Sequence, residues 1–178
     1  MATRLERQGA PPVLGVDVGG VLVDRAAEGS DTSFFGSDPM STPMVPDAFA
    51  AVATLAPLFG WRVHVISKAG PKISALTREW LARHEFFALT GVSPSNLHFV
   101  RKRHEKAPVC AQLGVTHFVD DRLDVLEHLE GVVEHRILFL GGLGLNTPPQ
   151  TLDSSIREIV SWADTVRSIE QSLVAPPT

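Results

Sequence analysis

The sequence has little cysteine, no excess of positive charge and no long apolar run, and each absence excludes a class of protein. The single cysteine, Cys110, excludes an internal disulfide and any metal site built from cysteines. The 16 basic and 20 acidic residues give a net charge of -4, which is not the basic surface that binds duplex nucleic acid. No apolar run approaches the roughly 20 residues that span a bilayer, and residues 1–12 lack the apolar segment of a secretory signal. We therefore expect a cytoplasmic protein with no membrane partner.

The composition that remains is that of a globular protein. Apolar residues make up 44% of the 178 residues, which is enough to bury a substantial core within one domain. We expect this domain over residues 13–173, between a flexible N-terminal arm at 1–12 and a tail at 174–178. Residues 25–46 show no periodicity and predict a long loop near the site, and long loops inside compact domains are often functional.

Strand patterns alternate with helix patterns along the chain. Strands are predicted at residues 13–18, 61–67, 97–100, 116–121 and 135–140. Helices are predicted at residues 47–58, 70–87, 108–113, 122–129 and 152–173. This alternation predicts an α/β fold of three layers, a Rossmann-like parallel sheet with helices on both faces. The apolar stripe of the last helix either completes the core or forms a dimer contact, so a monomer and a homodimer both stay open.

Polar side chains follow several of the predicted strands, at the sheet edge where ligands of such folds bind. Taken one at a time, such residues are also common as helix caps and turn formers. Their joint occurrence favours a site, and because clustered carboxylates repel, it favours a hard cation such as Mg²⁺. These residues are Asp17, Ser67, Lys68, Lys106, Asp120 and Asp121.

Four segments in this order resemble the motifs of the haloacid dehalogenase superfamily of phosphohydrolases. An apolar strand leads into an aspartate in "VDVGGVL" (16–22), and a serine ends the strand "VHVIS" (63–67). A lysine precedes the fourth strand in "HEKAPVCAQLG" (104–114), and an acidic pair ends "HFVDD" (117–121). The resemblance covers about residues 13–140 and implies the strand order 5-4-1-2-3.

The resemblance implies a Mg²⁺-dependent phosphohydrolase. Asp17 would be the nucleophile that forms an aspartyl-phosphate intermediate. The metal would be bound by Asp17, the backbone carbonyl of Gly19 and Asp121, with Asp120 close by. It would offset the repulsion between the anionic nucleophile and an anionic substrate.

The same resemblance implies that the remaining motif residues surround the phosphate group of the substrate. Ser67 and Lys68 would bind phosphate oxygens, and the slim turn at Gly19 and Gly20 would let backbone N–H groups approach them. Lys106 would neutralise the charge that develops in the transition state. Asp124 would contact the metal ligands without binding the metal itself.

One position departs from the family pattern. Gly19 stands where phosphatases of the family carry a second aspartate as general acid and base, a contribution typically of about 10²–10⁴ in rate. A weakened phosphatase could take leaving groups that need no acid, or borrow Asp24 or His64 as the donor. The alternative is a catalytically weak or inactive protein of this fold that binds a phosphorylated ligand or a protein partner.

The gaps in which the family carries substrate-selecting inserts are short here. Residues 24–62 and 68–106 leave no room for a separate cap domain, so a minimal cap and an open site are expected. The segments "REWLARHEFF" (78–87) and "VDDR" (119–122) are partly similar to the small deoxyribonucleotidase branch of the superfamily. The expected substrate is therefore a phosphorylated small molecule or a nucleotide.

Overall fold

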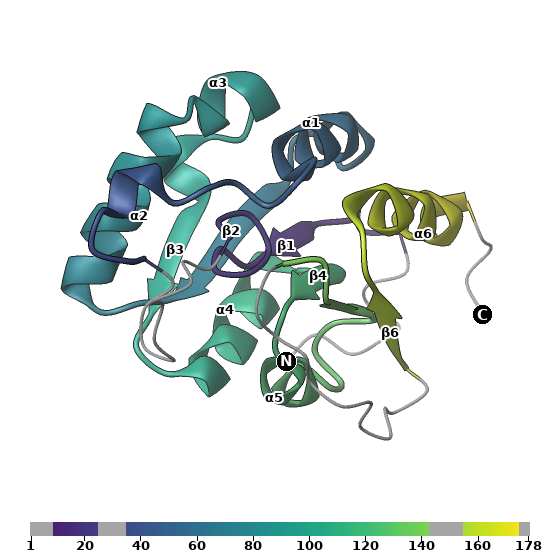
Figure 1. Ribbon diagram of the computed structural model, residues 1–178. Coiled ribbons are helices and arrows are strands. Elements are labelled where there is room, and N and C mark those ends of the chain that lie inside the picture. Colours follow the sequence, from purple (N-terminus) through teal and green to yellow (C-terminus); the bar gives the residue numbers. More distant parts are fainter. Residues whose placement is uncertain (1–8, 25–34, 143–154, 175–178) are drawn as a thin grey trace.

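A sheet of parallel strands with helices on both faces forms the centre of the protein (Figure 1). The computed structural model describes residues 9–24, 35–142 and 155–174. The six strands of the sheet lie in the order β3-β2-β1-β4-β5-β6. They are β1 (Leu14–Val16), β2 (Val63–Lys68), β3 (Leu97–Val100), β4 (His117–Asp120), β5 (His135–Phe139) and β6 (Ile156–Ile159). The α/β class and the parallel, Rossmann-like sheet agree with the prediction from the sequence.

The strand order differs from the predicted one because the sheet has a sixth strand. β6 pairs with β5 at an edge that the predicted order 5-4-1-2-3 left open. Residues 156–159 were expected inside the last helix, and that prediction is wrong. Ile156 and Ile159 are buried and the two residues between them are exposed, a spacing that also fits a helix. Residues 156–159 form a strand rather than a helix because they pair with the open edge of β5.

The last helix therefore begins later than expected. Ser161 accepts a hydrogen bond from the backbone N–H of Asp164 at 3.1 Å, which caps the first turn of α6 (Trp162–Val174). The other helices are α1 (Ala48–Leu58), α2 (Pro71–Arg83), α3 (Phe86–Thr90), α4 (Lys106–Leu113) and α5 (Leu123–His128). The single helix expected over 70–87 is divided, because Glu85 has the left-handed backbone angle φ of 58°.

Two apolar clusters cover the two faces of the sheet. α1, α3 and α6 pack on one face, and α4 and α5 pack on the other (Figure 1). In the middle strand, Gly15 allows the ring of Phe118 to lie against the backbone, because a Cβ at this position would be 2.5 Å from that ring. Burial on both faces explains why the strands read as continuous apolar runs.

The loop expected over 25–46 is described from Phe35 onward, and residues 25–34 lie outside the described part. Short 3₁₀ turns occur at Pro39–Ser41, Pro94–Asn96 and Arg103–Glu105. The returning chain pairs with the turn after β1, where Val45 donates its backbone N–H to the carbonyl of Leu22 at 2.9 Å. The indole of Trp80 donates to the carbonyl of Thr42 at 2.9 Å, so α2 holds this loop in place.

Of the predicted N-terminal arm (1–12), the structure describes residues 9–12. Of the predicted tail (174–178), it describes Val174. Within 9–24, 35–142 and 155–174, no helix combines the length and the apolar character needed to cross a membrane.

Candidate functional site

Asp17 lies directly after β1, at the start of a tight turn. Its backbone N–H donates to the carbonyl of Val119 at 3.0 Å, which places it beside the end of β4. The carbonyl of Val18 accepts hydrogen bonds from the N–H groups of the three residues 21–23. The backbone hydrogen bonds of this closed turn hold Asp17 in a fixed position at the sheet edge.

The turn needs glycine at position 20. Gly20 has φ of +76°, and a Cβ there would overlap the carboxylate of Asp121. Its N–H donates to the carbonyl of Val23 at 2.8 Å, and Gly19 forms a bridge with Val23. The turn after β1 therefore lies directly against the acidic pair that ends β4.

Asp17, Asp120 and Asp121 form the acidic cluster of the protein. One carboxylate oxygen from each lies within 4.8 Å of the others, and all three side chains are buried. The strand register explains why the three carboxylates lie close together. Val16 of β1 pairs with Val119 of β4, and the residues that follow these two positions therefore lie side by side. The sequence prediction that these three acids converge is confirmed.

Lys106 contacts two of the three carboxylates of the acidic cluster. Its Nζ is 2.9 Å from Oδ1 of Asp17 and 2.7 Å from Oδ2 of Asp120. The residue is 2% exposed, and its ammonium also lies 5.5 Å from the ring centre of Phe118. Burial acts to lower the pKa of Lys106, but the charges of Asp120 and Asp17 outweigh it and raise that pKa. The lysine is therefore charged at every pH of interest.

Asp120 is the most buried member of the acidic cluster. Burial raises the pKa of its carboxyl, the charges of Asp17 and Asp121 add to this, and Lys106 opposes it. Its Oδ1 accepts the backbone N–H of Arg122 at 3.0 Å, while its Oδ2 binds Lys106. With both oxygens bonded to protein groups, Asp120 positions the lysine and the turn after β4.

The donor set of the acidic cluster fits a hard cation. Three carboxylates and one ammonium leave an excess of negative charge when all are ionised, and the ligand atoms are oxygens. Mg²⁺ prefers this chemistry, which it usually completes with waters and substrate oxygens. Asp17 and Asp121, together with the carbonyl of Gly19, are the residues that would hold it.

Ser67 and Lys68 are the last two residues of β2, on the other side of β1 from the acidic pair. Val65 of β2 pairs with Val16 of β1, so Ser67 lies one residue beyond the level of Asp17. Ser67 is 2% exposed, and Lys68 is half-buried. The structure thus places both residues at the same edge of the sheet as the acidic cluster.

Asp124 lies near this edge but outside the acidic cluster. It is the second residue of α5, and its side chain is 45% exposed. It pairs with Arg122 at 3.1 Å and with Arg103 at 3.6 Å. Asp124 therefore joins the turn after β4 to the turn after β3, which leads to Lys106.

His64 and Asp24, the two candidate replacements for the missing general acid, lie in different parts of the fold. His64 pairs in register with Gly15, in the middle of the sheet, and its Nδ1 lies 3.0 Å from Nε2 of His98. Burial, followed by the charge of His98, lowers the pKa of His64. His64 is therefore remote from the carboxyl edge of the sheet. Asp24, in contrast, is buried at the end of the turn that carries Asp17, and its backbone N–H donates to the carbonyl of Pro43.

Two contacts that support the site have no clear signal in the sequence. Gly142, after β5, lies so close to the turn that a Cβ there would be 2.7 Å from the carbonyl oxygen of Gly20. The indole of Trp162 donates to the carbonyl of Val21 at 2.9 Å. In both contacts the two residues are more than 100 positions apart along the chain, so no local sequence pattern indicates them.

The fold and the site together define an α/β protein with a Rossmann-like parallel sheet and a buried acidic cluster, neutralised in part by a lysine, at its carboxyl edge. A scan against protein-family models and a search of curated proteins find no match to this chain.

Proposed function

We propose that this protein is a Mg²⁺-dependent phosphohydrolase in which Asp17 is the nucleophile. The observation that carries the proposal is the contact of 2.9 Å between Lys106 and Asp17 inside the acidic cluster. A carboxylate that is fixed by its backbone and paired with a buried ammonium has the features of an activated nucleophile. The resemblance of the four motifs to the haloacid dehalogenase superfamily supports the same conclusion.

Asp17 attacks the phosphorus of a phosphate ester, and the P–O bond to the leaving group breaks with its electron pair on the leaving oxygen. A water molecule then attacks the phosphorus of the aspartyl-phosphate, which releases inorganic phosphate and restores the carboxylate of Asp17. Protons are exchanged with solvent in both steps. Lys106 stabilises the negative charge that builds up on the phosphoryl oxygens during each step.

Residues of the turn and of β2 position the phosphate. Ser67 donates its hydroxyl proton to a phosphate oxygen, and Lys68 adds a positive charge beside it. Gly19 and Gly20 carry no side chain into the space beside Asp17. Asp17 and Asp121 would hold the metal, which would offset the charge repulsion between the nucleophile and the phosphate.

Gly19 determines which esters this site can hydrolyse. It has no proton to donate, and His64 is half-buried in the middle of the sheet, away from the carboxyl edge. The expected substrates are therefore phosphorylated small molecules or nucleotides whose leaving group is stable without protonation. Gly19 also favours a second candidate function, in which the site binds a phosphorylated ligand or a protein partner and turns over slowly or not at all.

Hydrolysis of aryl, acyl and alkyl phosphates, with and without Mg²⁺, tests the proposal. The wild-type protein is expected to hydrolyse aryl and acyl phosphates only with Mg²⁺, and Asp17→Asn is expected to be inactive because an amide cannot form the phosphoryl intermediate. Glu127→Gln, an exposed acid on α5, is the matched control and should retain activity. Absence of turnover for every ester, with phosphate esters still bound, would contradict hydrolysis and favour the binding function.

A further inference from the structure

Two histidines on neighbouring strands lie against each other, away from the acidic cluster. His64 is on β2 and His98 is on β3, and Nδ1 of His64 is 3.0 Å from Nε2 of His98. The strand register explains the contact, because His98 pairs with Ile66, which lies two residues beyond His64. Both rings therefore project from the same face of the sheet. The proposed hydrolysis uses neither of them.

The outer nitrogens of the two rings reach solvent. Both residues are half-buried, and within the described residues the contact between the rings is the one hydrogen bond that either side chain forms. Neither His64 Nε2 nor His98 Nδ1 is among the buried polar atoms that lack a partner. Solvent can therefore exchange protons with both rings.

Both rings are neutral near pH 7. Burial lowers the pKa of each ring, and the charge of His98 lowers the pKa of His64 further. A neutral imidazole carries its proton on one nitrogen and has a free lone pair on the other. In the hydrogen-bonded pair, one of the two facing nitrogens holds its ring's proton. When that proton moves through solvent to the outer nitrogen of the same ring, two lone pairs face each other and a cation between them is favoured.

The separation of the facing nitrogens fits a divalent transition metal. Bonds from such a metal to imidazole are about 2.0–2.1 Å long, so two of them at a right angle place their nitrogens about 2.8–3.0 Å apart. His64 Nδ1 and His98 Nε2 are 3.0 Å apart. Right angles are typical of the square-planar geometry of Cu²⁺ and Ni²⁺, for which imidazole is a suitable ligand. Tetrahedral Zn²⁺ would need a separation of about 3.3–3.4 Å.

We propose that His64 and His98 bind a divalent transition-metal ion, of the class of Cu²⁺ and Ni²⁺, through these two nitrogens. Among the described residues, no third histidine, cysteine, aspartate or glutamate lies close enough to join them, so water completes the coordination. The bound ion would link β2 to the edge strand β3. The acidic cluster offers only oxygen ligands, which suit Mg²⁺, so the two sites differ in the ions that they prefer.

Calorimetric titration with Cu²⁺, in the presence of excess Mg²⁺, tests the site. The wild-type protein is expected to bind Cu²⁺, and its electron paramagnetic resonance spectrum should show coupling to two imidazole nitrogens. His98→Gln removes one of the two ligands and should weaken binding by roughly tenfold or more. Asp121→Asn should bind Cu²⁺ as the wild type does, so a failure of the acidic cluster to bind Mg²⁺ leaves this test intact.

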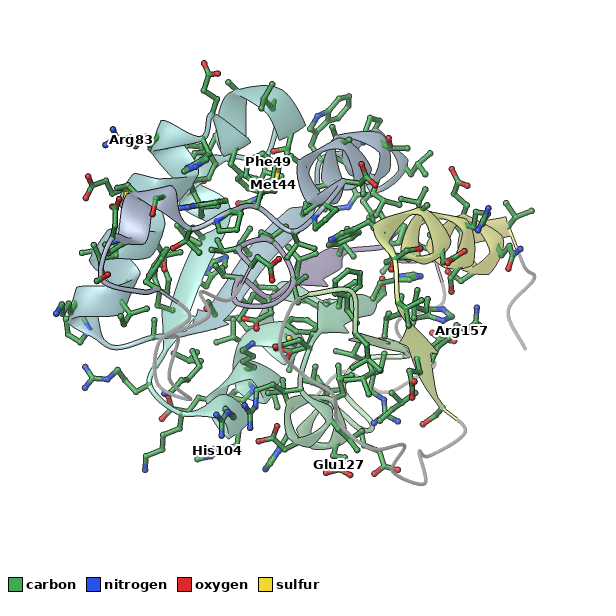
Figure 2. The ribbon with its side chains drawn as sticks, in the orientation of Figure 1. Met44, Phe49, Arg83, His104, Glu127 and Arg157 are labelled. Carbon is green, nitrogen blue, oxygen red and sulfur yellow. The ribbon has the colours of Figure 1, made fainter. Side chains whose placement is uncertain are left out.

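His104→Gln is the matched control, because His104 also has a histidine neighbour but at a greater distance. Its ring centre is 6.1 Å from that of His128, compared with 5.2 Å between His64 and His98. His104 is exposed, and Figure 2 shows it on the turn beside α4 and α5. The affinity of His104→Gln for Cu²⁺ should equal that of the wild type.

NMR spectra of the wild-type protein locate the ion without any substitution. Because Cu²⁺ is paramagnetic, substoichiometric amounts should broaden the ring signals of His64 and His98 before those of the other histidines. Three results would overturn the proposal: a spectrum with oxygen ligands alone, unchanged affinity in His98→Gln, or first broadening at another pair such as His117 and His135. None of these readouts depends on whether the protein hydrolyses any ester.

Discussion

Lys106 and Asp120 form an ion pair in which Nζ and Oδ2 are 2.7 Å apart and both side chains are withdrawn from solvent. α4 begins with the lysine and β4 ends with the aspartate, so the pair joins these two elements at the acidic cluster. A buried pair of this kind contributes to positioning more than to net stability, but losing Asp120 leaves the buried charge of Lys106 with one of its two carboxylate partners, Asp17.

Asp120→Ala is therefore expected to destabilise the protein by about 3–5 kcal/mol, the usual range when one partner of a buried pair is removed. Urea unfolding measures this change. Arg167→Ala, which breaks an exposed ion pair with Asp164 on α6, should shift the midpoint much less. Equal midpoints for the two variants would contradict the role of the buried pair.

Mg²⁺ is expected to raise the melting temperature, because a cation that binds only the folded state stabilises it by mass action. Asp121→Asn should abolish most of this rise, since it removes one of the two carboxylates expected to bind the ion. Glu127→Gln, an exposed acid on α5, should keep it. A melting temperature that does not respond to millimolar Mg²⁺ would mean that the acidic cluster binds no such ion.

Gly20→Ala and Gly114→Ala form a matched pair. Both glycines have a left-handed backbone, with φ of +76° and +68°, so alanine costs roughly 1–2 kcal/mol of backbone strain at either position. Only at position 20 would the new Cβ overlap Asp121, whereas nothing lies within 4 Å at position 114. We expect Gly20→Ala alone to lose Mg²⁺ binding in calorimetric titration. Loss of binding in both variants would point to general destabilisation.

Gly19→Asp is expected to restore a general acid where the family pattern has one. The rate on alkyl phosphates should rise selectively, by up to the roughly 10²–10⁴ that such catalysis supplies, while aryl phosphates change little. Steady-state kinetics on both ester classes measures the ratio. A wild-type protein that already hydrolyses alkyl and aryl esters equally fast would show that another residue acts as the acid.

His117 is expected to make the protein sensitive to acid. Burial, with a smaller effect of His135, lowers the pKa of His117 from 6.5 to about 3. Because the unfolded chain then binds a proton that the folded protein does not, stability is complete above about pH 6.5 and is lost as the pH falls below it. The loss is about 2 kcal/mol between pH 7 and pH 5, measured by urea unfolding. His117→Gln should flatten this dependence, and His104→Gln, on the surface, should not.

Much of the fold could be predicted because five of the strands are short, largely apolar runs that alternate with helical patterns. The acidic cluster followed from the same logic, since parallel strands bring their carboxyl ends to one edge. β6 could not be predicted, because burial of Ile156 and Ile159 alone fits a helix as well as a strand. The pairing of Asp124 with Arg103 also depends on how the turn after β3 meets the start of α5 in space, which local sequence does not encode.

The hydrogen bond from Trp162 to Val21 joins parts of the chain that are 141 positions apart. Because a chain is synthesised from its amino end, the turn that carries Asp17 is made before α6, and the carbonyl of Val21 lacks this partner until α6 has followed. A nascent chain that stops before α6 therefore lacks one of the contacts that shape the turn. The turn can reach its final hydrogen bonding only after α6 has been synthesised and has packed against it.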